Sequence, residues 1–178
     1  MGLTYIASVT ASSSATLEFT TGIDSTYNEY QFHFVNMNVA TDADEFSFQV
    51  NAAGQSGFNE TITSTVFFAY HAENDAYTNF AYHTGEDQAQ GTAYQTIARN
   101  VANDADGSMS GVLTLYAPSS TTYVKHFTAT TQYMHENPDS WNANVAGYIN
   151  TTSAIDEISF KAMAGNIDSG TIHMYGVG

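Results

Sequence analysis

The sequence predicts an all-β protein, a two-sheet antiparallel β-sandwich of the jelly-roll type. Three observations carry this prediction. Hydrophobic side chains recur at every second residue, the strand formers Val, Ile, Thr, Tyr and Phe gather in short runs, and Gly, Asn, Asp and Ser separate the runs. Neither heptads nor the strand-helix-strand spacing of a parallel sheet interrupts the pattern. Many short strands of this kind are typical of sandwiches.

The alternation is clearest in two runs. Phe46, Phe48 and Val50 alternate with polar residues, and Ile158 and Phe160 do the same. Each run predicts a strand with one face in the core and the other outside it. The expected strands are residues 3–9, 15–20, 29–39, 45–50, 62–70, 77–83, 92–99, 109–116, 122–133, 143–149, 156–163 and 170–176.

Two stretches depart from the simple pattern. Between Tyr30 and Val39 the apolar set changes parity after Phe34, which predicts a β-bulge or bend near that residue. The second stretch is 92–102, whose apolar residues also fit the spacing of a short helix. For this segment the sequence leaves strand and helix open.

One domain covering residues 1–178 is the expected organisation. A chain of 178 residues with 43% hydrophobic side chains can bury a core of its own. Turn residues separate the expected strands, and no segment resembles a linker between domains.

The charge balance excludes whole classes of partner. The chain carries 18 acidic residues and only three basic ones, Arg99, Lys125 and Lys161, for a net charge of −15. Binding nucleic acid needs clustered Lys and Arg, so we expect no nucleic-acid partner and no attachment to an anionic membrane. No targeting segment or membrane span is visible, which predicts synthesis as a soluble protein in the cytoplasm.

The residues predict no enzyme and no cofactor. Nucleophile-elbow, phosphate-loop, dinucleotide and zinc-protease motifs are all missing from the sequence. Carboxylate pairs for glycoside hydrolysis stay open as an alternative, because 18 acids allow many pairs. The six histidines lack the spacing of a zinc site, so we expect no metal ligand among them.

Calcium is a weaker alternative at two acidic turns. Residues 42–45 and 104–107 gather carboxylates, but neither has the third ligand and terminal glutamate of a calcium loop. Aspartates that bond their own backbone are the favoured interpretation of both turns.

Aromatic residues are the candidate contact residues. The sequence Phe-Ala-Tyr-His occurs at 68–71 and again at 80–83, which predicts two successive strands with the same face pattern. Its tyrosines could stack on a sugar, although core or interface packing explains such residues more often. The candidates for interface or glycan contact are Tyr70, Tyr82, Tyr123, Tyr133, Trp141 and Tyr148.

Several segments together resemble a family of small virion structural proteins of tailed bacteriophages that infect aquatic and marine bacteria. The resemblance spans nearly the whole chain, but it rests on turns and strands and brings no catalytic or ligand residue. Its most distinctive piece is the closing Ser-Gly-Thr-Ile-x-x-Tyr-Gly at 169–176. The segments that carry it are residues 22–27, 30–34, 70–71, 97–100, 103–106, 118–127 and 165–176.

The resemblance implies a structural protein on the exterior of the virion, with capsid decoration or cementing favoured over a tail position. It also implies association with copies of itself, as a homotrimer, and with the major capsid protein or other virion proteins. The first alternative is a tail- or fibre-associated module that binds a receptor or carbohydrate. An enzyme that depolymerises host polysaccharide is the second.

Overall fold

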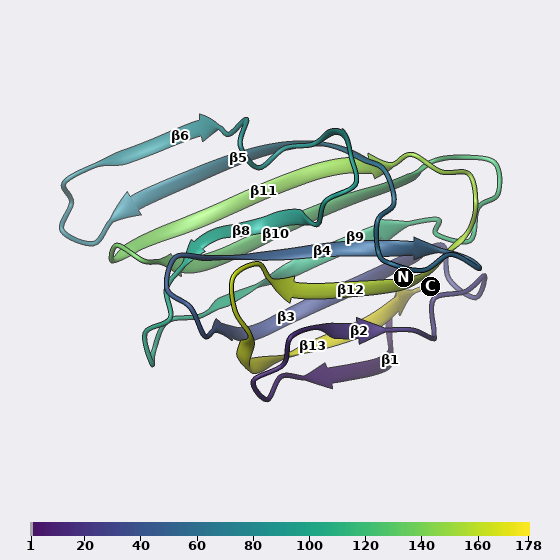
Figure 1. The fold of residues 1–178 in the computed structure, drawn as a ribbon, viewed down its shortest axis with the longest axis horizontal. Coiled ribbons are helices and arrows are strands. Elements are labelled where there is room, and N and C mark those ends of the chain that lie inside the picture. The colour runs from purple at the N-terminus through teal and green to yellow at the C-terminus, as the bar shows by residue number, and fades with distance from the viewer. Residues whose placement is uncertain (1) are drawn as a thin grey trace.

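The computed structural model describes residues 2–178, which form thirteen β-strands and contain no helix (Figure 1). No helix in this part of the chain could therefore cross a membrane. The strands are β1 (Leu3–Thr10), β2 (Leu17–Phe19), β3 (Glu29–Val39), β4 (Asp44–Ala52), β5 (Ile62–Ala72), β6 (Thr78–Tyr82), β7 (Ala89–Gly91), β8 (Gln95–Val101), β9 (Met109–Tyr116), β10 (Lys125–His135), β11 (Asp139–Ile149), β12 (Ile155–Ala162) and β13 (Ile167–Val177).

The strands form two antiparallel layers. The larger layer has the order β1-β13-β3-β9-β10-β11-β5-β6, with the short β7 also on β5, and the smaller has the order β2-β12-β4-β8. His135 in β10 pairs with Val101 in β8, so the two layers are joined into one folded-over sheet. The all-β antiparallel prediction is confirmed, and the expected pair of separate sheets is replaced by this continuous one.

The strand pairs are nested along the chain. The strands β1, β2, β3 and β4 pair with β13, β12, β9 and β8 respectively, so that a long folded ribbon wraps around the core. Two insertions widen the larger layer: β5 to β7 between β4 and β8, and β10 with β11 between β9 and β12. Figure 1 shows these inserted strands extending the larger layer away from β1.

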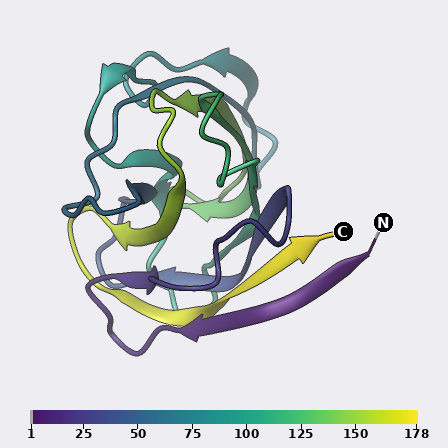
Figure 2. The same ribbon diagram turned by 90° about the vertical axis from the view of Figure 1, so that its right-hand side faces the viewer.

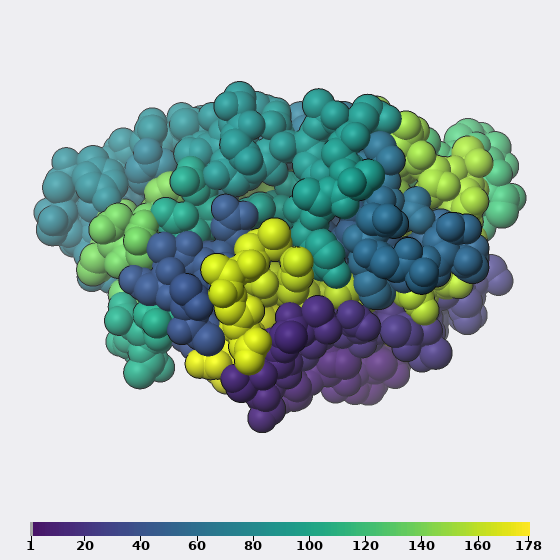
Figure 3. Space-filling model, viewed as in Figure 1, coloured from purple at the N-terminus to yellow at the C-terminus, as the bar shows by residue number. Residues whose placement is uncertain are grey.

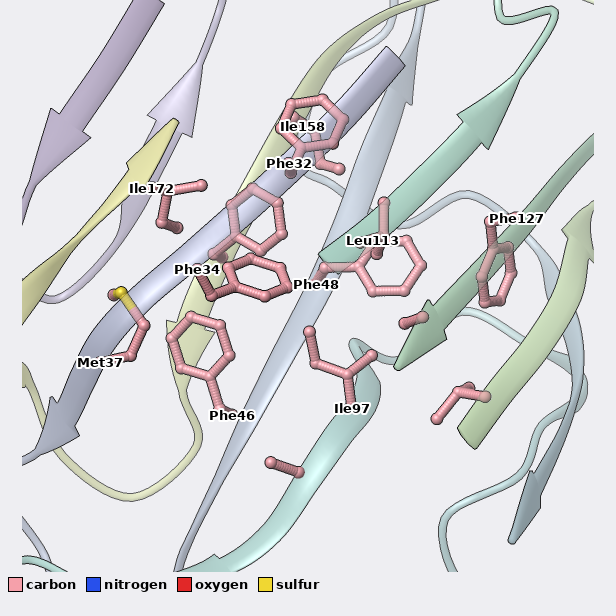
Figure 4. Packing of buried hydrophobic residues seen from close by; sticks show 14 of the residues in the cluster. Phe32, Phe34, Met37, Phe46, Phe48, Ile97, Leu113, Phe127, Ile158 and Ile172 are labelled. Carbon is pink, nitrogen blue, oxygen red and sulfur yellow. The ribbon is translucent and has the colours of Figure 1, made fainter. Parts of the chain in front are cut away.

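The core lies between the two layers and is built on phenylalanine. Phe32 and Phe34 point inward from β3 (Figure 4). Both meet Phe160 of β12, with ring centroids 5.6 and 5.3 Å apart. Phe46 of β4 packs on Phe34 at 5.7 Å. Ring pairs at these separations add to the free energy gained by burying their area. The rings therefore hold the smaller layer against the larger one.

The predicted bulge near Phe34 is confirmed. The pairing of β3 with β9 shifts register between Phe34 and Met37, and Asn36 has a positive φ of 51°. After this shift Met37 and Val39 take over as the buried residues of the strand. One extra residue thus turns the second half of β3 back toward the core.

The helical alternative for 92–102 is wrong. Residues Gln95–Val101 form β8, which pairs with β4 along its length and meets β10 at one residue. Ile97 and its neighbour Ala98 are both fully buried, because this strand is covered on both sides. Burial on both sides weakens the two-residue alternation, which is why helical spacing also fitted. The three-residue β7 was not expected at all.

The repeated Phe-Ala-Tyr-His segments do form successive strands, β5 and β6, but the expectation of a shared face pattern is wrong. The hairpin pairs Phe67 with Tyr82, so residues of equal parity in the two strands face opposite ways. Phe68 is fully buried, whereas Phe80 is 68% exposed on the other side. The similarity is in the sequence alone.

The closing motif has a steric basis at both of its glycines. Gly170 has a φ of +112°, and a Cβ atom there would lie 2.7 Å from the Asn36 carbonyl oxygen at the bulge. A Cβ atom at Gly176 would lie 2.2 Å from the ring of Tyr27. These glycines let β13 pass close to β3 and to the loop before it.

We expect Phe160→Ala to lower the free energy of unfolding by about 3–5 kcal/mol, because it removes the ring that several aromatic neighbours share. Chemical denaturation measures the change. The matched control is Phe80→Ala, at an exposed position, with an expected loss under about 1 kcal/mol. Equal losses in the two variants would show that the phenylalanine layer does not hold the sandwich together.

Candidate functional site

The widest accessible surface built from regular strands is the side of the larger layer that faces away from the core. We call it the outer face. From β1, β13, β3 and β9 it takes Leu3, Tyr5, Ser8, Thr10, Thr171, His173, Tyr175, Val177, Glu29, Gln31, His33, Val35, Ser110, Val112, Thr114 and Tyr116. From β10, β11, β5 and β6 it takes His126, Thr128, Thr130, Gln132, Met134, Ser140, Asn142, Asn144, Ala146, Tyr148, Thr63, Thr65, Phe67, Ala69, His71, Thr78, Phe80 and Tyr82.

The outer face is almost free of permanent charge. Glu29 is its one carboxylate, and neither Lys nor Arg occurs on it, although the chain has a net charge of −15. Four of the six histidines lie on it instead. Depletion of charged residues together with enrichment in aromatic ones is the compositional mark of protein interfaces.

Polar groups on the outer face hydrogen-bond to one another. Along β3 the Gln31 amide donates to Glu29 Oε1 at 2.9 Å, and Gln31 Oε1 lies 3.0 Å from His33 Nε2. Gln132 Nε2 donates to Ser140 Oγ across β10 and β11 at 2.9 Å. Paired polar groups lose less free energy when a partner covers them than unpaired ones do. The face can therefore be hydrated in the free protein and can also be covered by a partner.

Two histidines meet tyrosines at the β1 end of the outer face. His33 lies 4.9 Å from the Tyr175 ring, and Tyr5 lies within 6.4 Å of His173, measured between ring centroids. Burial, with the nearby His173 as a smaller cause, lowers the pKa of His33 below its usual value. This shift favours the neutral form of the His33 imidazole.

The three basic side chains are all engaged elsewhere. Arg99 Nε lies 3.2 Å from Glu86 Oε1, and Lys161 sits 4.3 Å over the ring of Tyr94. Lys125 is fully buried and donates to two backbone carbonyl oxygens, at 2.9 and 3.2 Å. The outer face therefore offers no Lys or Arg side chain for a salt bridge to a partner.

The six aromatic candidates separate into three groups. Tyr82 and Tyr148 lie on the outer face, where Tyr82 donates to Asp87 and Tyr148 meets the His126 ring edge-on. Tyr123 lies in the loop before β10 and is 72% exposed. The remaining three, Tyr70, Tyr133 and Trp141, face inward.

For Tyr133 and Trp141 the interface interpretation is corrected. Their side chains are 2% and 7% exposed, because odd-numbered residues of β10 and β11 point into the core. Burial raises the pKa of the Tyr133 hydroxyl. Both side chains serve packing, and the expected site that joins Tyr70 to Tyr82 is also excluded, since β5 and β6 present them on opposite faces.

Trp141 lies between two rings. Tyr70, from β5, stacks on it at 4.3 Å with an interplanar angle of 6°, and His135, from β10, stacks at 4.3 Å and 17°. Since β5 and β10 flank β11 on its two sides, the indole is held between them. Both indole faces are thus occupied and are not free for a sugar.

A groove of about 440 Å³ opens beside this stack. Tyr77 lies at its rim, is 46% exposed and donates its hydroxyl to Asp139 Oδ2. This hydrogen bond raises the pKa of Tyr77. Asn79 and Asn137 supply amides. The expectation from sequence missed Tyr77, the first residue of the expected strand 77–83, and Asp139, which lies between the expected strands 122–133 and 143–149.

In the acidic turn at residues 42–45, two carboxylates accept hydrogen bonds from backbone N–H groups of other segments. Asp44 Oδ1 accepts N–H groups of Met163 and Ala164 at 3.0 and 2.9 Å, and Asp42 Oδ1 accepts that of Asn103 at 3.3 Å. Within residues 2–178 no three His, Cys, Asp or Glu side chains are grouped so as to hold a metal ion. Asp44 Oδ1 also accepts the adjacent Glu45 N–H at 2.7 Å, so the turn 42–45 agrees in part with aspartates that bond their own backbone, and for 104–107 that interpretation stays a prediction.

Comparison with known proteins adds no further assignment. The chain matches no family model, no curated protein and no solved structure.

We expect stability to fall as the pH drops through about 6.5 because His135 is buried. Burial lowers its pKa below the usual 6.5. Just below pH 6.5, His135 is therefore protonated in the unfolded chain but stays neutral in the folded protein. In His135→Asn, whose carbonyl can still accept the Asn137 N–H, thermal unfolding should depend less on pH between about 7 and 5. The control is His126→Asn, at an exposed position. An unchanged pH dependence in His135→Asn would contradict the assignment.

Proposed function

We propose that this protein is a structural component of the exterior of a tailed-bacteriophage virion, where it decorates or cements the capsid by adhesion and performs no catalysis. One observation carries the adhesive role: a chain with a net charge of −15 keeps the broad outer face nearly free of charge. The phage assignment rests on the sequence resemblance. The structure contributes the surface that would make the contact.

The distribution of charge favours adhesion to an uncharged protein surface over binding to a polyanion. Acidic loop residues such as Asp75, Asp104 and Asp106 surround the sheet, and they disfavour polyanions such as DNA. A partner can cover the outer face without burying an unpaired charge, which would cost several kcal/mol. The face spans about 34 by 25 Å, from strand spacing and rise, an area near the ~800 Å² per partner of a stable interface. The expected partner is a capsid subunit that presents an uncharged surface with hydrogen-bonding groups.

This role places the protein on the virion surface after synthesis in the host cytoplasm. It includes no nucleic acid, membrane or cofactor among the partners. Association into a homotrimer stays a prediction from the resemblance.

Location in the virion tests the proposal directly. We expect density for this chain on the capsid exterior in a cryo-electron microscopy map, with the outer face against the shell. The predicted composition of that contact is aromatic and polar, with few salt bridges. Density confined to the tail tip would contradict the capsid role.

Gln132→Glu tests which surface adheres. The change adds a carboxylate to the middle of the outer face, where covering it would cost binding free energy. We expect affinity for capsids that lack the protein to fall at least tenfold, or about 1.4 kcal/mol, in a sedimentation binding assay. Gln55→Glu makes the same change in an exposed loop and should bind like wild type. Equal binding by both variants would remove the outer face from the proposal.

The second candidate is a tail- or fibre-associated module that binds carbohydrate, and the groove at Tyr77 supports it. Its aromatic rim and its amide and carboxylate groups are the chemistry that sugars need. In this case we expect Tyr77→Ala to abolish binding on a glycan array, while Tyr123→Ala, which changes an exposed tyrosine outside the groove, leaves it intact. Absence of binding by the wild-type protein would reject this candidate.

A further inference from the structure

The strand β1 is an open edge with unusual properties. It lies at one end of the larger layer, and β13 is its one hydrogen-bonded neighbour in the part of the chain that the structure describes. Figure 2 shows β1 and the end of β13 running side by side away from the body of the molecule, and Figure 3 shows the N-terminal segment, in purple, along one rim. Leu3 and Tyr5 are 50% and 57% exposed.

This edge lacks the features that keep edge strands apart. Proteins protect such edges with charged residues or proline, yet the first charged residue of this chain is Glu18 and β1 contains no proline. The other open edges differ. The strand β6 is flanked by Asp75 and Asp87, β2 is three residues long and contains Glu18, and β7 is also three residues long and follows Asp87. In a chain of net charge −15, β1 is therefore the edge where two copies meet with the least repulsion.

Hydrogen bonds to β13 show which backbone groups of β1 are free. Gly2 and Gly178 exchange two hydrogen bonds, at 2.9 and 3.2 Å, and alternation from there turns the groups of Leu3 and Tyr5 away from β13. A bulge then shifts the register between Tyr5 and Ala7. Beyond it Ala11 donates to Gly170 at 2.9 Å, which turns the groups of Ser8 and Thr10 outward in the same way.

We propose that two copies of this chain pair through β1, antiparallel and about a twofold axis that passes between Ile6 and Ala7. The bulge makes the four outward-facing residues symmetric about that point: Leu3 of one copy lies opposite Thr10 of the other, and Tyr5 lies opposite Ser8. Each pair exchanges two hydrogen bonds, so the contact contains about eight. The bulge therefore sets the position of the axis, because an unbulged strand would turn residues 3, 5, 7 and 9 outward and centre them on Ile6 instead.

Two further features favour this pairing. The hydrogen bonds between Gly2 and Gly178 hold the strand in an extended form in the single chain, so association loses little conformational entropy. The four outward-facing residues also point their side chains onto the outer face, so the paired larger layers present one continuous outer face. This dimer is an alternative to the homotrimer that the resemblance implies, and it stands independently of the proposed virion role.

Cross-linking tests the register. The chain has no cysteine, so Ala7→Cys introduces a single thiol. Across the proposed axis the two Cys Cα atoms lie about 6 Å apart, within reach of a disulfide. We expect mild oxidation to give a covalent dimer, with thiol titration falling to zero. Ser56→Cys, in an exposed loop away from β1, should form no covalent dimer under the same conditions. An unreacted Ala7→Cys thiol, or equal cross-linking of both variants, would overturn the proposed register.

Solution mass tests the pairing itself. By light scattering without capsids we expect a dimer, and Leu3→Pro should weaken it at least tenfold, because an outward N–H is lost from each copy while the β1 bonds to β13 remain. The matched control is Leu3→Ala, which loses the same side chain but keeps the N–H and should dimerise more tightly than Leu3→Pro. A monomer at the highest soluble concentration, a trimer, or a dimer that Leu3→Pro leaves unchanged would overturn the inference. Capsid binding by a monomer would leave the proposed function standing.

Discussion

The alternation of side chains along the larger layer is the constraint on which the rest of the structure depends. Strand pairing is continuous from β6 to β1, so, away from the bulges, every second residue of eight strands contributes to one surface. The inner surface carries the phenylalanine layer, and the outer one is polar and aromatic. A slip of one residue in any strand would exchange the two. The bulges near Asn36 and Ile6 are therefore exceptions with consequences: one returns β3 to the core, and the other sets the symmetry of the β1 edge.

Most of this architecture could be predicted from the sequence, because apolar and polar residues alternate with a period of two along a half-buried strand. The strands, the bulge after Phe34 and the all-β class follow from that signal alone. Orientation between strands does not. The register of the β5–β6 hairpin decided that Tyr70 and Tyr82 face apart, and a single sequence does not contain that register. Trp141 could have been assigned to the core, since Ala143 and Val145 share its parity. Segment 92–102 misled because burial on both sides removes the alternation.

Charge is distributed so that contact and repulsion occupy different parts of the molecule. More than half of the acidic residues lie in loops, while Arg99, Lys125 and Lys161 are engaged within the fold. Exposed acids keep a protein soluble, but their long-range repulsion is screened beyond about 8 Å at physiological salt. Local desolvation therefore limits association more than net charge does. A surface with few carboxylates avoids most of that local cost: the outer face has one, Glu29, and the β1 edge has none.

The polar character of the outer face resolves a conflict between solubility and adhesion. An apolar sheet of this size would aggregate as soon as it was made, whereas a charged one would resist being covered. Side chains such as Gln31, His33 and Gln132 form hydrogen bonds with neighbouring side chains on the face. The face is therefore hydrated in the free chain and can be covered by a partner with few polar groups left unpaired. The affinity of one such face is modest, because polar contacts replace contacts with water. Pairing through β1 would place two faces in one rigid unit, and two linked weak contacts bind far more tightly than one.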